Sequence, residues 1–105
     1  MFGVKRFAKG IAKAQFRSYM GFKRAHPNAD AQTLYAATIS MRPGYDEAAV
    51  ASIIELAREI EPFNLRAIAV TLACTELGQL TKSSVSEKDF NNIMVGVSSV
   101  IPVEA

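Results

Sequence analysis

The chain has 105 residues and a formal net charge of +2, and 50% of its residues are hydrophobic while 21% are charged. This composition is typical of one globular domain and excludes an intrinsically disordered chain. No apolar run is long enough to cross a bilayer and the N-terminus has no secretory signal, so we expect a soluble, cytoplasmic protein. With a single cysteine, Cys74, and a single histidine, His26, we expect no disulfide, no four-ligand zinc site and no cofactor.

The charges are distributed unevenly along the chain. Seven of the twelve Lys and Arg residues, but none of the ten Asp and Glu residues, lie in residues 1–29. The rest of the chain therefore carries a formal charge of −5. Such asymmetry between two parts of a chain favours an anionic partner for the basic part.

Residues 4–24 are predicted to form a basic amphipathic helix, which the His26-Pro27 pair ends. Apolar and small residues at spacings of three and four form one stripe, and the basic side chains take the opposite side. The predicted stripe is Val4, Phe7, Ile11, Ala14, Ser18 and Phe22. Within a single domain of residues 1–105, residues 1–25 form this helix and residues 28–102 form a helical body. The helix either packs into the core or extends as a semi-detached arm.

Two helices follow, at residues 29–41 and between Asp46 and Pro62. Asn28 or Asp30 caps the first, and Asp46 caps the second, because carboxylate and amide oxygens accept hydrogen bonds from the free amides of a first turn. The predicted buried stripe of the first is Ala31, Leu34, Tyr35, Thr38 and Met41. That of the second is Val50, Ile53, Ile54, Ala57 and Ile60.

A fourth helix begins at Asn64 and is apolar nearly all round, which is typical of a buried helix. A fifth follows the turn-like residues 81–84 and is capped by Ser86. Its predicted stripe is Phe90, Ile93, Met94, Val97 and Ile101. The valine-rich residues 95–103 could alternatively form a strand, and residues after Pro102 are expected to fray. The prediction is therefore an all-α fold: an irregular or orthogonal bundle of about five helices with a buried central fourth helix.

Three residues are candidates for catalysis, and for each we favour a structural role. His26 suits a helix C-terminus, where an imidazolium is stabilised by the helix dipole. Cys74 lies in the most apolar helix, where a thiol behaves as a small hydrophobe. Glu76 marks the exposed side of that helix. The chain also has no glycine-rich phosphate loop and no metal-binding motif, so we predict a non-enzymatic protein.

Two functions fit the basic helix. The first is a protein–protein interaction or regulatory protein, binding a partner or itself as a homo-oligomer, because exposed aromatic and methionine side chains are typical of interfaces. Its candidate contacts are Phe2, Phe16, Tyr19 and Met20. The alternative is a binder of an anionic surface, either nucleic acid or acidic membrane. Its candidate contacts are Lys5, Arg6, Lys9, Lys13 and Arg17. Two further interpretations remain: a core helix whose basic side faces the acidic body, and an organellar targeting segment.

Overall fold

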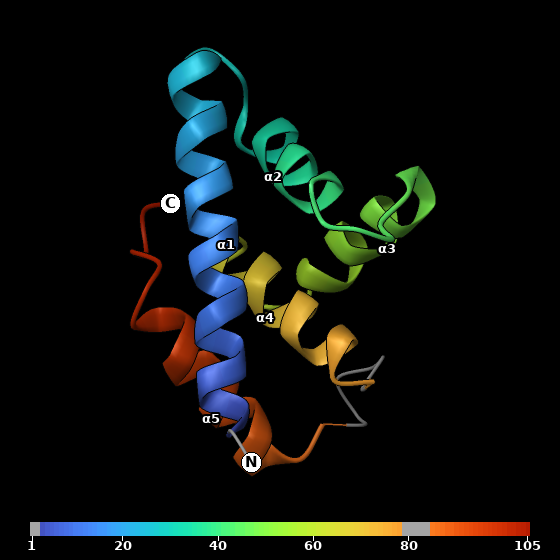
Figure 1. Cartoon of the computed structure of the whole chain (residues 1–105), viewed down its shortest axis with the longest axis vertical. Coiled ribbons are helices and arrows are strands. Elements are labelled where there is room, and N and C mark those ends of the chain that lie inside the picture. The colour runs from blue at the N-terminus through green and yellow to red at the C-terminus, as the bar shows by residue number, and fades with distance from the viewer. Residues whose placement is uncertain (1–2, 79–84) are drawn as a thin grey trace.

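Five α-helices form the part of the chain that the computed structural model describes, residues 3–78 and 85–105, and no strand occurs in these residues (Figure 1). They are α1 (Val4–Ala25), α2 (Ala31–Ser40), α3 (Glu47–Ala57), α4 (Leu65–Glu76) and α5 (Glu87–Ser98). The all-α prediction is confirmed. The alternative strand at residues 95–103 is wrong, because residues 95–98 form the last turn of α5.

The long helix α1 runs along the length of the molecule, and the shorter helices pack beside it (Figure 1). It packs most extensively on α5, and also contacts α4 and α2. The helix α3 lies farther out and contacts α2 and α4. Helix α1 therefore contributes its buried residues to the same core as the acidic part of the chain.

The four shorter helices begin at capping residues: the sequence predicts Asp46 and Ser86 as caps, Asp30 as one of two candidates, and Asn64 as a helix start. The side chains of Asp30, Asp46, Asn64 and Ser86 each accept a hydrogen bond from the backbone N–H three residues later. The donors are Thr33, Ala49, Ala67 and Asp89, at 2.7, 2.9, 3.2 and 3.1 Å. Each such cap stabilises its helix by about 1 kcal/mol. The predicted turn at residues 81–84 lies outside the described residues.

The helix α4 is the central helix of the bundle, as predicted. Leu65 and every residue from 67 to 73 are buried, and α4 packs against α1, α3 and α5. A helix surrounded on three sides has little surface left for polar groups. This explains why its sequence is apolar nearly all round.

The buried face of α1 differs from the prediction. The residues of α1 that are buried are Ala8, Ile11, Ala12, Gln15 and Tyr19. Only Ile11 belongs to the predicted stripe, and Ala14 is exposed. Val4, Phe7 and Phe22 of the predicted stripe are partly buried against the core, so α1 is rotated by less than one residue from the orientation that its large apolar side chains indicate.

The close approach of α1 and α5 accounts for this rotation. A Cβ atom added to Gly96 of α5 would lie 2.5 Å from the carbonyl oxygen of Lys5 and 3.4 Å from the Cβ of Ala8. Helices can approach this closely only where small residues face each other, so α1 turns Ala8 and Ala12 inward. The sequence prediction followed the large apolar side chains, so it did not detect that small residues are needed where α1 meets α5.

The end of the stripe predicted for residues 29–41 and the residues after Pro102 also differ from the prediction. Met41 is 63% exposed, because α2 ends at Ser40 and the chain turns away, and Ile39 is buried in its place. At the C-terminus, Ile101 is buried as predicted, and Ala105, in the stretch expected to fray, is buried as well. The side chain of Tyr35 and the backbone N–H of Leu65 both donate to the carbonyl oxygen of Ala105, at 3.2 and 3.3 Å. These bonds attach the last residues to the start of α4.

Candidate functional site

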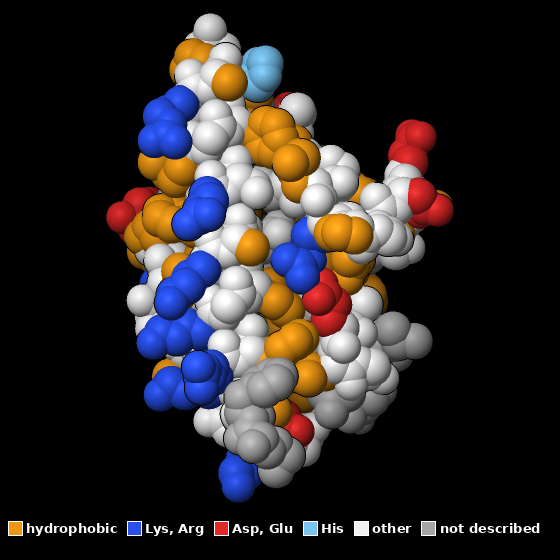
Figure 2. Space-filling model, viewed as in Figure 1, with side chains coloured by type: hydrophobic (Ala, Val, Ile, Leu, Met, Phe, Trp, Pro, Cys, Tyr) orange, Lys and Arg blue, Asp and Glu red, His pale blue; other side chains and the backbone are white. Residues whose placement is uncertain are grey.

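Five basic side chains form a row along the solvent side of α1. We call this row the basic ridge, and its members are Lys5, Arg6, Lys9, Lys13 and Arg17, all exposed. Figure 2 shows Lys and Arg side chains as a column along this helix. Four-residue steps advance by about 6 Å, so the ridge is roughly 18 Å long. The sequence-predicted anionic contacts are thus brought together on one surface.

The basic ridge has no acidic partner within the described residues. The single ion pair found in residues 3–78 and 85–105 joins Arg42 to Glu76. In Figure 2 acidic side chains lie over α3 on the right, in the middle of the face, and also at the left edge beside the basic column. The interpretation in which the basic side of α1 faces an acidic surface of the body therefore finds no ion pair to support it. Five like charges without an ion-pair partner in the described residues favour an anionic ligand at the ridge.

The aromatic residues that we expected at an exposed interface are differently placed. Tyr19 is only 5% exposed, and its ring stacks on Tyr35 with the centroids 6.1 Å apart. The expectation that Tyr19 is exposed is therefore wrong: the rotation of α1 turns it towards the core. Phe16 and Met20 are partly buried against that core. Phe2 lies outside the described residues.

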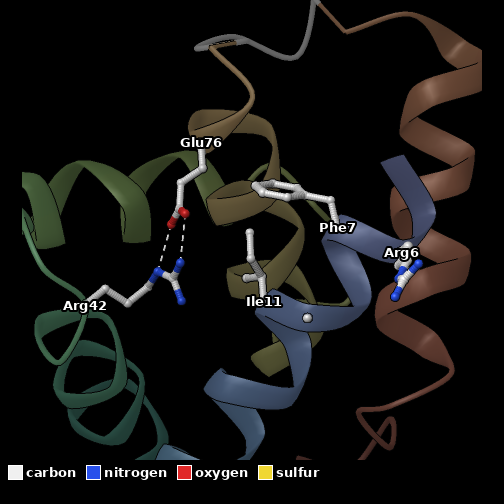
Figure 3. Close-up of a pocket in the computed structure, with 6 residues that line it drawn as sticks. Arg6, Phe7, Ile11, Arg42 and Glu76 are labelled. Carbon is white, nitrogen blue, oxygen red and sulfur yellow. Dashed lines mark hydrogen bonds and ion pairs between the residues drawn. The ribbon is translucent and has the colours of Figure 1, made fainter. Parts of the chain in front are cut away.

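A groove runs beside the ridge, between α1 and the C-terminal end of α4. It has a volume of about 490 Å³ and is lined by Arg6, Phe7, Gly10, Ile11, Arg42 and Glu76. Figure 3 shows Phe7 and Ile11 extending from α1 towards the side where Arg42 and Glu76 meet. We call it the Gly10 groove. Sequence reasoning did not identify this groove, since its two walls come from separate segments of the chain.

The groove adjoins a second hollow over the ridge itself. That hollow measures about 550 Å³, and its lining includes Lys5, Lys9 and Lys13. Arg6 and Gly10 line both hollows. No atom lies within 4 Å of the position that a Cβ of Gly10 would occupy. Gly10 thus adds no side chain where the two hollows adjoin.

The far wall of the groove is a two-point ion pair. The Nε and Nη2 atoms of Arg42 each donate to a different carboxylate oxygen of Glu76, both at 2.7 Å. The hydroxyl of Tyr45 also faces Glu76, 3.3 Å from Oε2. Burial, and then the charge of Glu76, raise the pKa of Tyr45, so its hydroxyl stays protonated and can donate. Glu76 lies on the exposed side of α4, as predicted.

The remaining candidates for catalysis are not brought together. His26 is exposed just beyond the C-terminal end of α1, whereas Cys74 lies in the last turn of α4. Figure 1 shows these two helix ends well separated. Burial raises the pKa of the Cys74 thiol, which favours the less reactive protonated form. Among the described residues, no three His, Cys, Asp or Glu side chains are grouped so that they could hold a metal ion.

Within the described part of the chain, no helix is both long enough and apolar enough to cross a membrane. Comparison of the chain with protein families, with curated proteins and with solved structures finds no match. The ridge and the groove are therefore the features from which a function can be inferred.

Proposed function

We propose that this protein binds the phosphate backbone of a nucleic acid through the basic ridge, without a catalytic step. The observation that supports this proposal is the row of five exposed basic side chains that lack an acidic partner in the described residues. Each Lys or Arg that neutralises a phosphate releases condensed counterions, which favours binding. At a rise of about 3.4 Å per nucleotide, a ridge of roughly 18 Å runs beside about five phosphates.

The alternative anionic partner, an acidic membrane, fits the ridge less well. A helix that lies in a membrane interface inserts bulky apolar side chains next to its lysines. In α1, Ile11 is buried, and Phe7 and Phe22 are partly buried against the core. The exposed residues between the basic side chains are Gly10 and Ala14. This surface favours contacts with charged phosphates rather than with lipid tails.

The protein–protein interaction hypothesis stays a prediction. Burial of Tyr19 removes one of its four candidate contacts, and Phe16 and Met20 already pack on the core of their own chain. Among the described residues of α1, the basic ridge is therefore a better candidate for the functional surface than an apolar surface that would form a homo-oligomer.

Fluorescence anisotropy with a short labelled oligonucleotide, over a series of salt concentrations, tests the proposal. Five phosphate contacts predict that log K falls with log salt with a slope of about −3.5 on a single strand. The double variant Lys9→Gln/Lys13→Gln should bind more weakly and reduce the magnitude of that slope by about 1.4.

The control is Arg58→Gln/Lys88→Gln, which removes the same charge from two exposed residues outside α1. It should bind nearly as tightly as the unmodified protein. Equal weakening by both double variants would show that net charge, not the ridge, attracts the oligonucleotide. Absence of binding at low salt would refute the proposal.

A further inference from the structure

We infer that the basic ridge also binds a second copy of this chain, through acidic side chains on and just after α3, and that this contact competes with nucleic acid for the ridge. We call these side chains the acidic face. They are Glu47 and Glu55 on α3 and Glu59 in the turn that follows it, all exposed. The contact between copies stands independently, whereas its competition with nucleic acid rests on the proposed function.

The ridge and the acidic face carry opposite charges, and neither has an ion-pair partner among the described residues of its own chain. The ion pair found in residues 3–78 and 85–105 joins Arg42 to Glu76 and involves neither surface. Figure 2 shows the basic column on the left and acidic side chains over α3 on the right. Complementary charges favour encounter between two protein surfaces and set how they align. Surfaces that lie apart in one molecule can meet in this way between two copies.

The charges of both surfaces are spaced by multiples of four residues. On the ridge, basic side chains recur every fourth residue, at Lys5, Lys9, Lys13 and Arg17. On α3, Glu47 and Glu55 are separated by two such steps. Two four-residue steps advance about 12 Å along a helix, so both carboxylates can face ridge side chains that have the same separation.

Small residues on both surfaces let the two helices approach each other. Gly10 and Ala14 lie exposed beside the ridge, and the exposed residues between the acidic side chains include Ala48, Ala51 and Ser52. None of these side chains is long enough to hold a partner helix away, because the distance between packed helices depends on the size of the residues at the contact. Helix α3 is also accessible, since it lies at the outside of the bundle and packs on α2 and α4.

Arg58 lies next to the acidic face in the sequence, but its side chain is held elsewhere. Its Nη2 atom donates to Oε1 of Gln32 on α2, and its guanidinium lies 4.8 Å from the ring centroid of Phe63. It forms no ion pair with an acidic side chain in the described residues. The acidic face therefore keeps its negative charge available for cations of another molecule.

The contact is head-to-tail, because the two surfaces that form it are different. A copy that uses its ridge keeps its own acidic face free for another copy, so assemblies can grow into open chains or closed rings. The contact consists of exposed charges, which salt screens: the Debye length falls from about 30 Å at about 0.01 M salt to about 3 Å at about 1 M. We therefore expect self-association at low salt and none at high salt.

Sedimentation velocity over a series of protein concentrations, at these two salt concentrations, tests the contact. At low salt the weight-average sedimentation coefficient of the unmodified protein should rise with concentration. The variants Lys9→Gln/Lys13→Gln and Glu55→Gln/Glu59→Gln each weaken one of the two surfaces, and each alone should lose this rise. All four side chains are exposed, and circular dichroism melts establish that both variants fold.

A mixture of these two variants tests the head-to-tail arrangement. One variant supplies an intact acidic face and the other an intact ridge, so the mixture should form a species of two chains and nothing larger. The matched control is Glu87→Gln/Glu104→Gln, which removes the same charge as the α3 variant from two exposed residues of another region. It should self-associate as the unmodified protein does.

The competition is tested by adding an excess of an oligonucleotide of about five nucleotides, the length that the ridge accommodates. Because the oligonucleotide and the acidic face occupy the same side chains, the assemblies should dissociate into single chains with the oligonucleotide bound. Assemblies that bind the oligonucleotide without dissociating would overturn the competition.

The remaining outcomes separate this inference from the proposed function. Single chains at every concentration at low salt, or assemblies that persist at high salt or in the Glu55→Gln/Glu59→Gln variant, would overturn the contact between ridge and acidic face. Oligonucleotide binding would then still support the proposed function. Assemblies that dissociate in salt as expected, in a protein that binds no oligonucleotide, would support the contact and overturn both the proposed function and the competition.

Discussion

The packing of α1 on α5 depends on a single missing side chain, and Gly96→Ala is the change that tests it. The added methyl carbon would lie 2.5 Å from the carbonyl oxygen of Lys5 and 3.3 Å from its carbonyl carbon. Ordinary contact begins near 3.4 Å, so the two helices must move apart locally by roughly 0.9 Å. The obstacle is backbone rather than a flexible side-chain end, and no change of rotamer relieves it.

Two opposing effects determine the magnitude. Overpacking a tight contact costs about 1–3 kcal/mol, and a clash with backbone belongs in the upper half of that range. Replacing a helical glycine with alanine recovers about 1 kcal/mol of helix propensity. The net loss in the free energy of unfolding is therefore about 1–2 kcal/mol, which lowers the Tm of a domain of this size by about 4–8 °C.

Urea unfolding followed by far-UV circular dichroism measures this loss, with Gly21→Ala as the control. Gly21 is in α1 with open space around it, so its alanine variant gains propensity without a clash and should be stabilised by up to about 1 kcal/mol. The difference between the two variants isolates the steric cost. If Gly96→Ala proved as stable as Gly21→Ala, the close approach of α1 and α5 would be refuted.

Two further predictions concern buried polar groups. The side-chain nitrogen of Gln15 is buried and has no hydrogen-bond partner among the described residues, so Gln15→Met should raise the free energy of unfolding by about 1 kcal/mol in the same urea assay. A decrease would show that the amide is satisfied. Burial raises the pKa of both Tyr35 and Tyr45 in the folded state. Above pH 10.0, the ordinary tyrosine pKa, the folded state therefore holds protons that the unfolded state has lost, and the free energy of unfolding should fall as pH rises. Urea titrations at a series of alkaline pH values should show that Tyr45→Phe reduces this loss, and an unchanged pH dependence in that variant would contradict the assignment.

The starts of the shorter helices could be predicted because the interactions that set them are local, whereas α3 ends at Ala57, before the predicted stop at Pro62. Each N-cap is one hydrogen bond between a side chain and a backbone amide three residues away, as at Asp46 and Asn64. The burial of α4 could also be predicted, because a helix without a polar face has no side that suits water. Both kinds of information lie within one helix.

The orientation of α1 could not be predicted in the same way. Its inward face contains Ala8 and Ala12 because α5 approaches closely at Gly96, and the partner helix lies about 80 residues later in the chain. Periodicity of large apolar residues instead indicated a face that included Ala14, which is exposed. The distance between two helices depends on both of their surfaces, so neither sequence stripe determines it alone.

In the candidate site, too, one feature could be predicted from a single helix and another depends on contacts between distant parts of the chain. The sequence by itself determined the basic ridge, because exposed charges at helical spacing share a side wherever the helix packs. Only the tertiary structure decided that the Gly10 groove lies next to it, since Arg42 and Glu76 are 34 residues apart and meet only when α4 is packed against its neighbours. A row of charges follows from the geometry of one helix. A groove needs walls from several elements, and these come together only when the core forms.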